Sequence, residues 1–443
     1  VPAASYTKTD ADVAKLVDDR NTAVDKVYGE KIATTEVDLN GSRSGGAATD
    51  PVTKAEMTFP EGEGVRTTET NLGDFAADAI LWQARQTLGE ENVDAALTNG
   101  GGIREALAKG DISKKSLLAV FPFGNTVATI DVTGAQLLEA LEAATCTTPE
   151  AIGAFPQVSG IEFTVNAAKA YDQGELYPGS TYYAPKSINR VSIQTVGGKA
   201  FDPEATYTIA TNDFLAAGGD TYYAFSAATV NYDLGLAMDE VVMDYITEEL
   251  GGTVTAKDYG AAQGRITIQG VNPFTDVTSA SPYYEGILWA VDQDITNGTT
   301  ATTFSPSNPC TRAQIVTFLW RAAGSPEPTL TEQQYTDVTN TNAYYYKALL
   351  WAAEQGMETG DTFRPDDPCT RMEAVYFMWC AAGSPETEAD LPFTDVAAES
   401  DDCVAWAVEK GVTNGTTATT FSPDNSCTRG QIATFLYRAA NAA

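Results

Sequence analysis

The sequence predicts a multidomain protein in which a layered α/β domain is followed by an all-α domain of three repeated units. Residues 271–443 present one pattern three times, and a period of this length is typical of supersecondary units that bury a face against one another. Upstream of the repeats, strand-like and helix-like segments alternate, as they do in layered α/β domains. A chain of 443 residues is long enough for several domains with cores of their own.

The composition is that of an acidic globular protein. Apolar residues make up 43% of the chain and charged residues 20%. Lys and Arg total 27 against 60 Asp and Glu, a net charge of −33, which argues against nucleic acid and anionic membranes as partners. No stretch approaches the roughly 18 consecutive apolar residues of a membrane span. A phosphate ligand would therefore have to be held by a few local arginines.

Histidine is absent, which excludes the usual Ser-His-Asp and Cys-His forms of catalysis and removes the commonest zinc ligand. None of the six cysteines shows the Cys-x-x-Cys spacing of a metal site. We expect them to be small buried side chains, although a bridge between Cys403 and Cys427 remains open. The sequence predicts no metal site and no cofactor in this chain.

The first segment, residues 1–35, is predicted to be a long helix standing apart from the next domain. Residues 5–31 form an amphipathic pattern. Its apolar stripe consists of Val13, Leu16, Val17, Val24 and Val27.

The second domain is predicted over residues 36–270. Its first part, residues 40–64, is rich in Gly, Ser, Thr, Ala and Glu and is predicted to be a loop. A helix follows over 72–88 and a short strand over 95–97, after which strands and helices alternate.

Four segments of this domain carry groups suited to binding a ligand. They are residues 65–73 before a helix, the glycine-rich turn 99–104 after a strand, residues 121–125, and residues 212–220. Glycines allow a ligand to approach the backbone closely, although each segment taken alone is also explained as an ordinary turn or core residue. The candidate substrate-binding residues are Arg66, Arg104, Phe123, Asn125, Phe214 and Asp220.

The chemistry of these residues suits a nucleotide or nucleoside. Two arginines can fork onto a phosphate, and two phenylalanine rings can hold a flat base between them. Asn125 and Asp220 can form hydrogen bonds with the base or the ribose.

Together and in this order, the four segments resemble the C-terminal domain of the 5′-nucleotidase family. The resemblance covers roughly residues 60–270, and residues 5–31 are similar to the interdomain helix of that family. It implies that Phe123 and Phe214 clamp the base of the substrate while the arginines contact its phosphate. Gly62 stands where some members have a further phosphate arginine, and Thr221 stands where a glycine is usual.

The three repeats are predicted to span residues 271–328, 329–387 and 388–443. Each opens with an aromatic residue followed by Thr-Asp-Val and closes with Cys-Thr-Arg and an apolar helix. Each threonine is expected to cap its helix, with a Gln or Glu three residues on completing a capping box. These partners are Gln314, Glu373 and Gln431.

This pattern resembles a complete set of three S-layer homology domains. The resemblance implies a helical pseudo-threefold fold, noncovalent attachment to an anionic secondary cell-wall polymer, and an extracellular location on a bacterial cell wall. Three arginines at equivalent places in so acidic a chain also favour anion capture. The residues implied in polymer binding are Thr311, Arg312, Thr370, Arg371, Thr428 and Arg429.

The sequence as a whole predicts the substrate-binding and wall-anchoring portion of a surface phosphohydrolase similar to 5′-nucleotidases. Hydrolysis in that family uses a separate N-terminal domain with two divalent metal ions, so we expect this chain to bind nucleotide without hydrolysing it. The alternative is a non-catalytic structural protein of a surface layer or filament that keeps the fold and self-assembles. A two-carboxylate glycosidase has no supporting motif.

Overall fold

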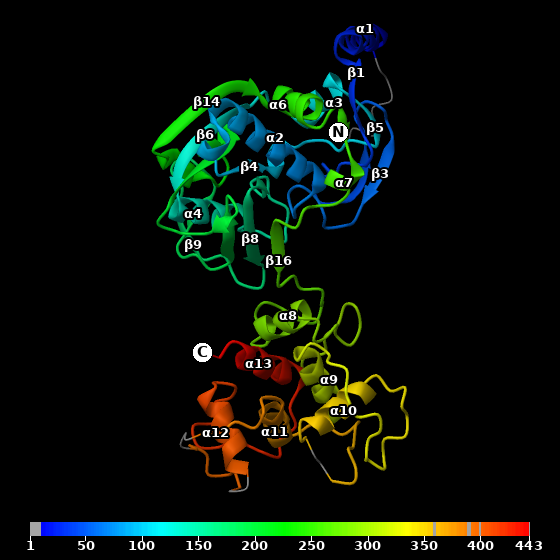
Figure 1. The fold of residues 1–443 in the computed structure, drawn as a ribbon, viewed down its shortest axis with the longest axis vertical. Helices are drawn as coiled ribbons and strands as arrows, with labels where there is room; N and C mark the ends of the chain where they lie inside the picture. Colours follow the sequence, from blue (N-terminus) through cyan, green and yellow to red (C-terminus); the bar gives the residue numbers. More distant parts are fainter. Residues whose placement is uncertain (1–9, 358–359, 388–390, 398–399, 443) are drawn as a thin grey trace. The chain divides into compact units, whose positions relative to one another are not determined.

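The computed structural model describes residues 10–357, 360–387, 391–397 and 400–442. The chain divides into two compact units, Val1–Ile268 and Gln269–Ala443 (Figure 1). Among the described residues, no helix is both long and apolar enough to cross a bilayer.

The first unit begins with helix α1 (Ala11–Tyr28), which Asp10 caps through its side chain. The helix ends three residues earlier than predicted, and residues 5–9 of the predicted helix lie outside the described residues. None of its residues is buried, so its apolar stripe faces solvent. An ion pair between Asp25 and Lys115 connects it to α3 (Lys114–Val120). Strand β1 (Lys31–Thr35) follows and pairs with strands of the α/β unit, so residues 31–35 extend that unit rather than the helical segment.

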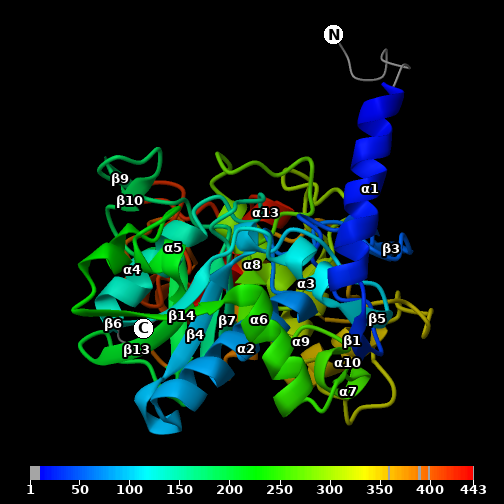
Figure 2. The same cartoon turned by 90° about the horizontal axis from the view of Figure 1, so that it is seen from above.

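A five-stranded sheet in the order β14-β6-β13-β4-β7 forms the centre of this unit (Figure 2). Only β4 and β13 run parallel. Side chains of both faces are buried: Ala96 packs with α2 and α6, while Ala95 and Leu97 pack with α4. The strands are β4 (Ala95–Asn99), β6 (Thr126–Thr133), β7 (Pro156–Ser159), β13 (Thr206–Asn212) and β14 (Val230–Ala237). The helices are α2 (Asn71–Leu88), α4 (Gly134–Ala144), α5 (Asp213–Ala216), α6 (Met238–Asp244) and α7 (Ala256–Tyr259).

Smaller sheets complete the unit and confirm the layered α/β architecture. One has the order β12-β11-β8-β16, one the order β15-β1-β5, and two are hairpins, β9–β10 and β2–β3. The strands are β2 (Gly46–Thr49), β3 (Glu56–Phe59), β5 (Gly110–Ser113), β8 (Ile161–Asn166), β9 (Gln173–Leu176), β10 (Tyr183–Pro185), β11 (Val191–Val196), β12 (Lys199–Ala200), β15 (Thr253–Val254) and β16 (Ile266–Gln269).

The hairpin β2–β3 corrects the predicted loop over residues 40–64. Each strand has only four residues. The first, Gly-Ala-Ala-Thr, lacks an alternation of apolar and polar residues, and the alternation of Glu-Met-Thr-Phe in the second is too short to predict a strand by itself. The buried carboxylate of Asp50 stabilises the turn by accepting hydrogen bonds from the amides of Val52 and Thr53 at 2.8 and 2.7 Å. Local side-chain bonds of this kind are what Asp contributes to turns.

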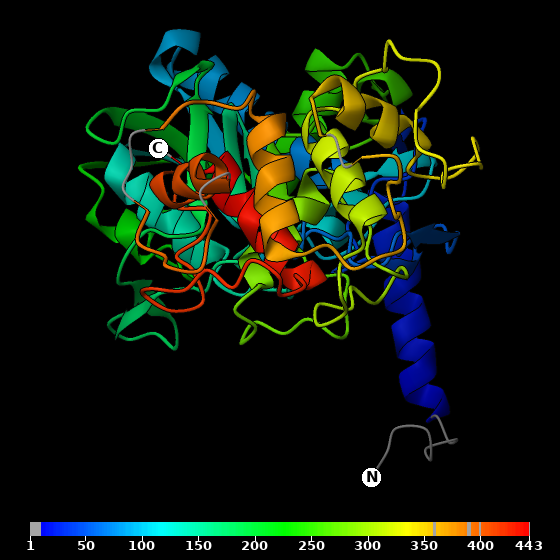
Figure 3. The same cartoon turned by 90° about the horizontal axis from the view of Figure 1, so that it is seen from below.

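The second unit is built from helices, as predicted, and its described residues form two helices in each repeat. The first helix of each repeat packs against the last helix of the preceding repeat, and the first repeat packs in this way against the third (Figure 3). The arrangement is therefore a closed ring of three. The helices are α8 (Tyr284–Asp292), α9 (Arg312–Ala322), α10 (Tyr346–Glu354), α11 (Arg371–Ala381), α12 (Asp401–Glu409) and α13 (Arg429–Ala440).

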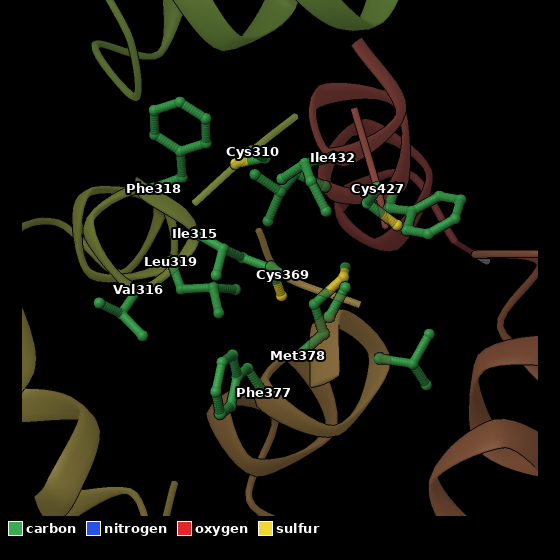
Figure 4. Packing of buried hydrophobic residues seen from close by; sticks show 14 of the residues in the cluster. Cys310, Ile315, Val316, Phe318, Leu319, Cys369, Phe377, Met378, Cys427 and Ile432 are labelled. Atoms are coloured by element: carbon green, nitrogen blue, oxygen red, sulfur yellow. The ribbon is translucent and has the colours of Figure 1, made fainter. Parts of the chain in front are cut away.

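Three equivalent cysteines lie at the centre of this ring (Figure 4). The amide of Cys310 donates to the carbonyl of Cys427, that of Cys427 to Cys369, and that of Cys369 to Cys310, at 2.9, 2.9 and 2.8 Å. This cycle of backbone hydrogen bonds is what a pseudo-threefold arrangement requires. All six cysteines are free and the three central ones are buried, as expected, and burial raises the pKa of the Cys310 thiol to about 12. No bridge joins Cys403 to Cys427.

The aromatic-Thr-Asp-Val motif that opens each repeat closes a loop within that repeat. The Asp276 carboxylate accepts hydrogen bonds from the amides of Phe304 and Ser305 at 2.8 and 2.7 Å. Asp337 and Asp395 bond the equivalent loops in the other two repeats. This Asp therefore recurs in each repeat because these backbone amides need a hydrogen-bond acceptor.

Candidate functional site

A cleft of about 700 Å³ opens on the first unit, and it brings the predicted residues together. They come from four segments that are far apart in the sequence. Arg66, Arg104, Phe123, Asn125, Phe214 and Asp220 all line this cleft.

The cleft lies where the parallel neighbours β4 and β13 end. Residues that follow the carboxyl ends of parallel strands share one edge of a sheet, which is the usual position of ligand sites in α/β folds. After β4 the chain turns tightly through Gly100, where a Cβ atom would lie 1.7 Å from the Val65 carbonyl oxygen, so only glycine fits. After β13, the side chain of Asn212 caps α5 by accepting from the amide of Leu215 at 2.9 Å. Helix α5 carries Phe214 into the cleft.

Two phenylalanine rings of the cleft are exposed to solvent. Phe123 is 62% exposed and Phe214 is 44% exposed, whereas large apolar side chains are usually buried. A Cβ atom on Gly219 would lie 2.5 Å from the Phe214 ring, so this glycine is required for the position of the ring. The Arg104 guanidinium lies 5.6 Å from the centre of the Phe123 ring. The rings are therefore available for stacking against a flat ligand.

Asp220 is held in a strained conformation inside the cleft. Its φ of 52° is unfavourable for a residue with a Cβ atom, and strain of this kind concentrates at functional sites. Its carboxylate accepts a hydrogen bond from Nδ2 of Asn99 at 3.0 Å. Burial raises the pKa of Asp220, while this hydrogen bond and the charge of Arg66 oppose the rise.

The cleft residues that were not predicted from the sequence include Arg43 and Tyr182. Burial lowers the pKa of Arg66, and the positive charges of Arg104 and Arg43 lower it further. In the described part of the chain, none of these three arginines forms an ion pair with a carboxylate. The cleft thus contains a positive centre in a strongly acidic protein.

The capping threonines of the repeats are confirmed. Thr311, Thr370 and Thr428 each accept the N3 amide of their helix, and the predicted Gln or Glu bonds back in every case. Each capping box satisfies backbone donors that would otherwise lack partners.

The three repeat arginines are far more buried than the sequence suggested. Arg312, Arg371 and Arg429 are 0%, 5% and 3% exposed. Each Nε donates to a phenylalanine carbonyl of the next repeat at 2.6 to 2.9 Å, and each guanidinium lies between two phenylalanine rings at 4.7 to 5.5 Å from their centres. The rings are Phe363 and Phe377, Phe421 and Phe435, and Phe304 and Phe318 respectively.

These arginines therefore join the repeats in a cycle, from the first to the second, the second to the third, and the third back to the first. Burial lowers the pKa of all three. Nη2 of Arg312 and of Arg429 is buried without a hydrogen-bond partner, whereas Nη2 of Arg371 donates to Thr413. Their contact with a wall polymer stays a prediction.

The repeats differ at the residue that follows this arginine. Gly430 leaves room for Tyr283, since a Cβ atom there would lie 2.6 Å from the tyrosine ring. In the second repeat the position holds Met372, whose sulfur lies 4.0 Å from the sulfur of Cys403. The larger side chain thus lies against the small side chain of Cys403, and the residue of the third repeat equivalent to Tyr283 is the small Ser400.

Both units match the family models of known protein domains. Residues 45–227 match the family model of the 5′-nucleotidase C-terminal domain. Residues 273–316, 334–375 and 392–433 match that of the S-layer homology domain. The chain consists of a 5′-nucleotidase C-terminal domain followed by three S-layer homology domains.

The relatives of this 5′-nucleotidase C-terminal domain are much longer proteins. The chain is 35% identical over 268 residues to the trifunctional nucleotide phosphoesterase protein YfkN of Bacillus subtilis, a match covering 60% of this chain and 16% of that protein. It is 27% identical over 261 residues to a cell wall protein of Listeria monocytogenes, covering 56% and 29%. The chain thus spans less than a third of the length of either relative.

Among solved structures, a 5′-nucleotidase precursor from Thermus thermophilus matches with 29% identity and a TM-score of 0.44. The match covers 58% of this chain and 43% of that one. Among the described residues, no group of three or more His, Cys, Asp or Glu side chains is arranged to hold a metal ion.

Proposed function

We propose that the 5′-nucleotidase C-terminal domain binds a nucleotide in its cleft while the S-layer homology domains attach the protein to an anionic cell-wall polymer. The observation that carries the first part is the convergence of six residues from four segments on one cleft of about 700 Å³. This volume lies within the range of small-molecule sites, which combine apolar walls with a few polar groups.

Each part of the cleft suits one part of a nucleotide. Phe123 and Phe214 are the exposed rings that would hold the base. Arg66 and Arg104 would contact the phosphate through charge-assisted hydrogen bonds. Asp220, fixed by Asn99, would accept from the ribose or base, and Asn125 lies on the same cleft. Chemistry on the bound phosphate would belong to a metal-bearing domain of the full phosphohydrolase.

The three S-layer homology domains and the similarity to a cell wall protein support the predicted extracellular, cell-wall localisation. The polymer partner follows from the same domains. The second unit would then serve as an anchor, and the first would bring a nucleotide-binding cleft to the cell surface.

Calorimetry with adenosine, AMP and UMP tests the binding proposal. The protein is expected to bind at least one of them, and Phe123→Ala or Phe214→Ala should weaken binding. Tyr232→Ala is a matched control, because Tyr232 is 55% exposed but does not line the cleft. No heat with any of the three ligands would remove the proposal and favour a structural surface protein.

Sedimentation with purified bacterial cell walls tests the anchor. Replacing Arg371 and Arg429 by Gln keeps polar groups at these positions and removes their charge, and the melting temperature shows whether the ring of repeats persists. If the variant is folded but no longer sediments with the cell walls, the result supports contact between these residues and the polymer. A folded variant retained as well as wild type assigns them to the fold alone.

A further inference from the structure

The hairpin β9–β10 brings a tyrosine, Tyr182, to the wall of the cleft. We propose that Tyr182 is a specificity-determining residue whose hydroxyl, together with the carboxylate of Asp220, recognises a sugar hydroxyl of the ligand. The inference rests on the proposed function of the cleft. It gives a ligand contact to a hairpin that no sequence pattern connected with the site.

Tyr182 reaches the cleft because the hairpin leaves the sheet that precedes it. Strands β8 and β11 pair directly, so residues 167–190 between them form an excursion from that sheet. At its base the amide of Asn166 donates to the carbonyl of Arg190 at 2.8 Å. The hairpin packs against α4 (Figure 2). Tyr182 lies at the end of the turn that joins the two hairpin strands.

The turn that carries Tyr182 is fixed to the body of the domain. The hydroxyl of the buried Tyr177 donates to Glu139 of α4 at 3.0 Å, and its ring stacks on Tyr223 with the ring centres 4.9 Å apart. The amide of Tyr177 donates to the carbonyl of Tyr182 at 2.9 Å, and the amide of Tyr182 donates to Oγ of Ser180 at 3.0 Å. Tyr182 is therefore held in position before a ligand arrives, which lowers the entropic cost of binding.

Two charged groups of the cleft act on the phenol of Tyr182. Burial raises the pKa of this phenol, the negative charge of Asp220 raises it further, and the positive charge of Arg66 opposes the rise. Gly153 lies beside both charged groups, since a Cβ atom there would be 3.7 Å from Oδ2 of Asp220 and 4.0 Å from Nη1 of Arg66. The three polar side chains thus line the same cleft, beside a glycine that leaves room for a ligand.

The pair of Tyr182 and Asp220 matches the hydrogen-bonding needs of a sugar hydroxyl. Such a hydroxyl donates one hydrogen bond and accepts others, whereas an ionised carboxylate can only accept. Asp220 can take the proton of the sugar hydroxyl, and the Tyr182 hydroxyl can donate to its oxygen. A ligand without that hydroxyl would leave polar groups of the cleft unpaired, and sites of this kind reject such analogues.

Calorimetry on the whole chain with AMP, 2′-deoxy-AMP and 3′-deoxy-AMP tests the inference. Wild type is expected to bind one of the two deoxy nucleotides about 10-fold more weakly than AMP. Tyr182→Phe removes only the hydroxyl, so it should weaken AMP binding about 5-fold. The same variant should leave the binding of that deoxy nucleotide unchanged, because the partner of the lost hydroxyl is already missing from the ligand.

Tyr183→Phe is the matched control. It removes the same group from the next residue of the hairpin, which is 42% exposed and is not part of the cleft lining. All three affinities should stay unchanged in this variant. Melting curves of both variants show that the domain is folded, and the comparison of the three ligands on wild type needs no substitution.

The inference is overturned if Tyr182→Phe leaves AMP binding unchanged, or weakens AMP and both deoxy nucleotides by the same factor. It is also overturned if wild type binds all three ligands equally well. Wild type that binds none of them would instead remove the proposed function of the cleft itself, so the two failures are distinguishable.

Discussion

Arginine and phenylalanine meet in both units of this protein, with different consequences. In the cleft, Arg104 lies against the exposed ring of Phe123, on a surface open to a ligand. In the repeats, Arg312 lies between two buried rings and bonds a backbone carbonyl. The residue types and the cation–π contact are the same. What differs is burial: the Arg312 guanidinium is enclosed and joins two repeats, whereas the Arg104 guanidinium lies on the cleft, where a ligand can reach it.

The largest expected effect is on the stability of the repeats. Arg312→Ala removes a buried cation that fills the space between Phe363 and Phe377, and it removes one of the two arginines that pair with Glu373, the other being Arg364. We expect a loss of about 3–5 kcal/mol in the free energy of unfolding of the second unit, measured by urea denaturation. Arg104→Ala in the cleft should change unfolding by less than about 0.5 kcal/mol. Equal losses of unfolding free energy in the two variants would contradict this distinction between the buried arginine and the cleft arginine.

The same contrast is expected for the rings. Phe123→Ala and Phe214→Ala should each weaken nucleotide binding by about 1–3 kcal/mol, because a stacked base loses one face, with little change in melting temperature. Calorimetric titration measures the change in nucleotide binding, and thermal unfolding measures the change in melting temperature. If a ring variant lowers the melting temperature of the domain but leaves nucleotide binding unchanged, that ring belongs to the core.

A buried pair of carboxyl groups in the first unit predicts a pH dependence. Burial and the nearby Glu69 raise the pKa of Asp74 from 3.8 to about 8, although Arg265 opposes the rise. The folded protein thus holds a proton that the unfolded chain loses above pH 4. Stability should fall as the pH rises from about 4 to 8 and then level off.

Asp74→Asn mimics the protonated group, so it should reduce this slope and stabilise the domain by about 2 kcal/mol at pH 9. Urea unfolding at pH 5, 7 and 9 measures the effect. Parallel curves for the variant and wild type would show that Asp74 does not carry the proton.

The smallest effect concerns the match of side-chain size between repeats. Gly430→Ala places a methyl group against the Tyr283 ring and should cost about 1–2 kcal/mol of stability. Pairing it with Tyr283→Ser, the residue type at the equivalent place opposite Met372, should recover most of that loss. Additive losses in the double variant would contradict the proposed compensation.

The sequence predicted features that depend on local pattern. The capping threonines precede apolar helices at a fixed spacing, so Thr311 and its equivalents could be recognised directly. The cleft residues Phe123 and Phe214 were found because each stands in a short segment with its own signal and because the segments resemble a known domain.

Features that depend on distant pairing were missed. Arg43 belongs to the cleft only because the hairpin β2–β3 brings its two ends together, and the sequence gives no sign of that pairing. The burial of Arg429 results from rings contributed by the first repeat, which no pattern around Arg429 reveals. The capping sequence placed these arginines at the starts of their helices, but it did not predict that contacts between repeats would bury them.

The cycle of hydrogen bonds through Cys310, Cys369 and Cys427 has a consequence for how the protein is made. The first repeat receives its partners from the third, which is synthesised last. Until α13 has left the ribosome, α8 has no helix to pack against and the ring stays open. The ring of repeats should therefore close only after all three repeats have been synthesised.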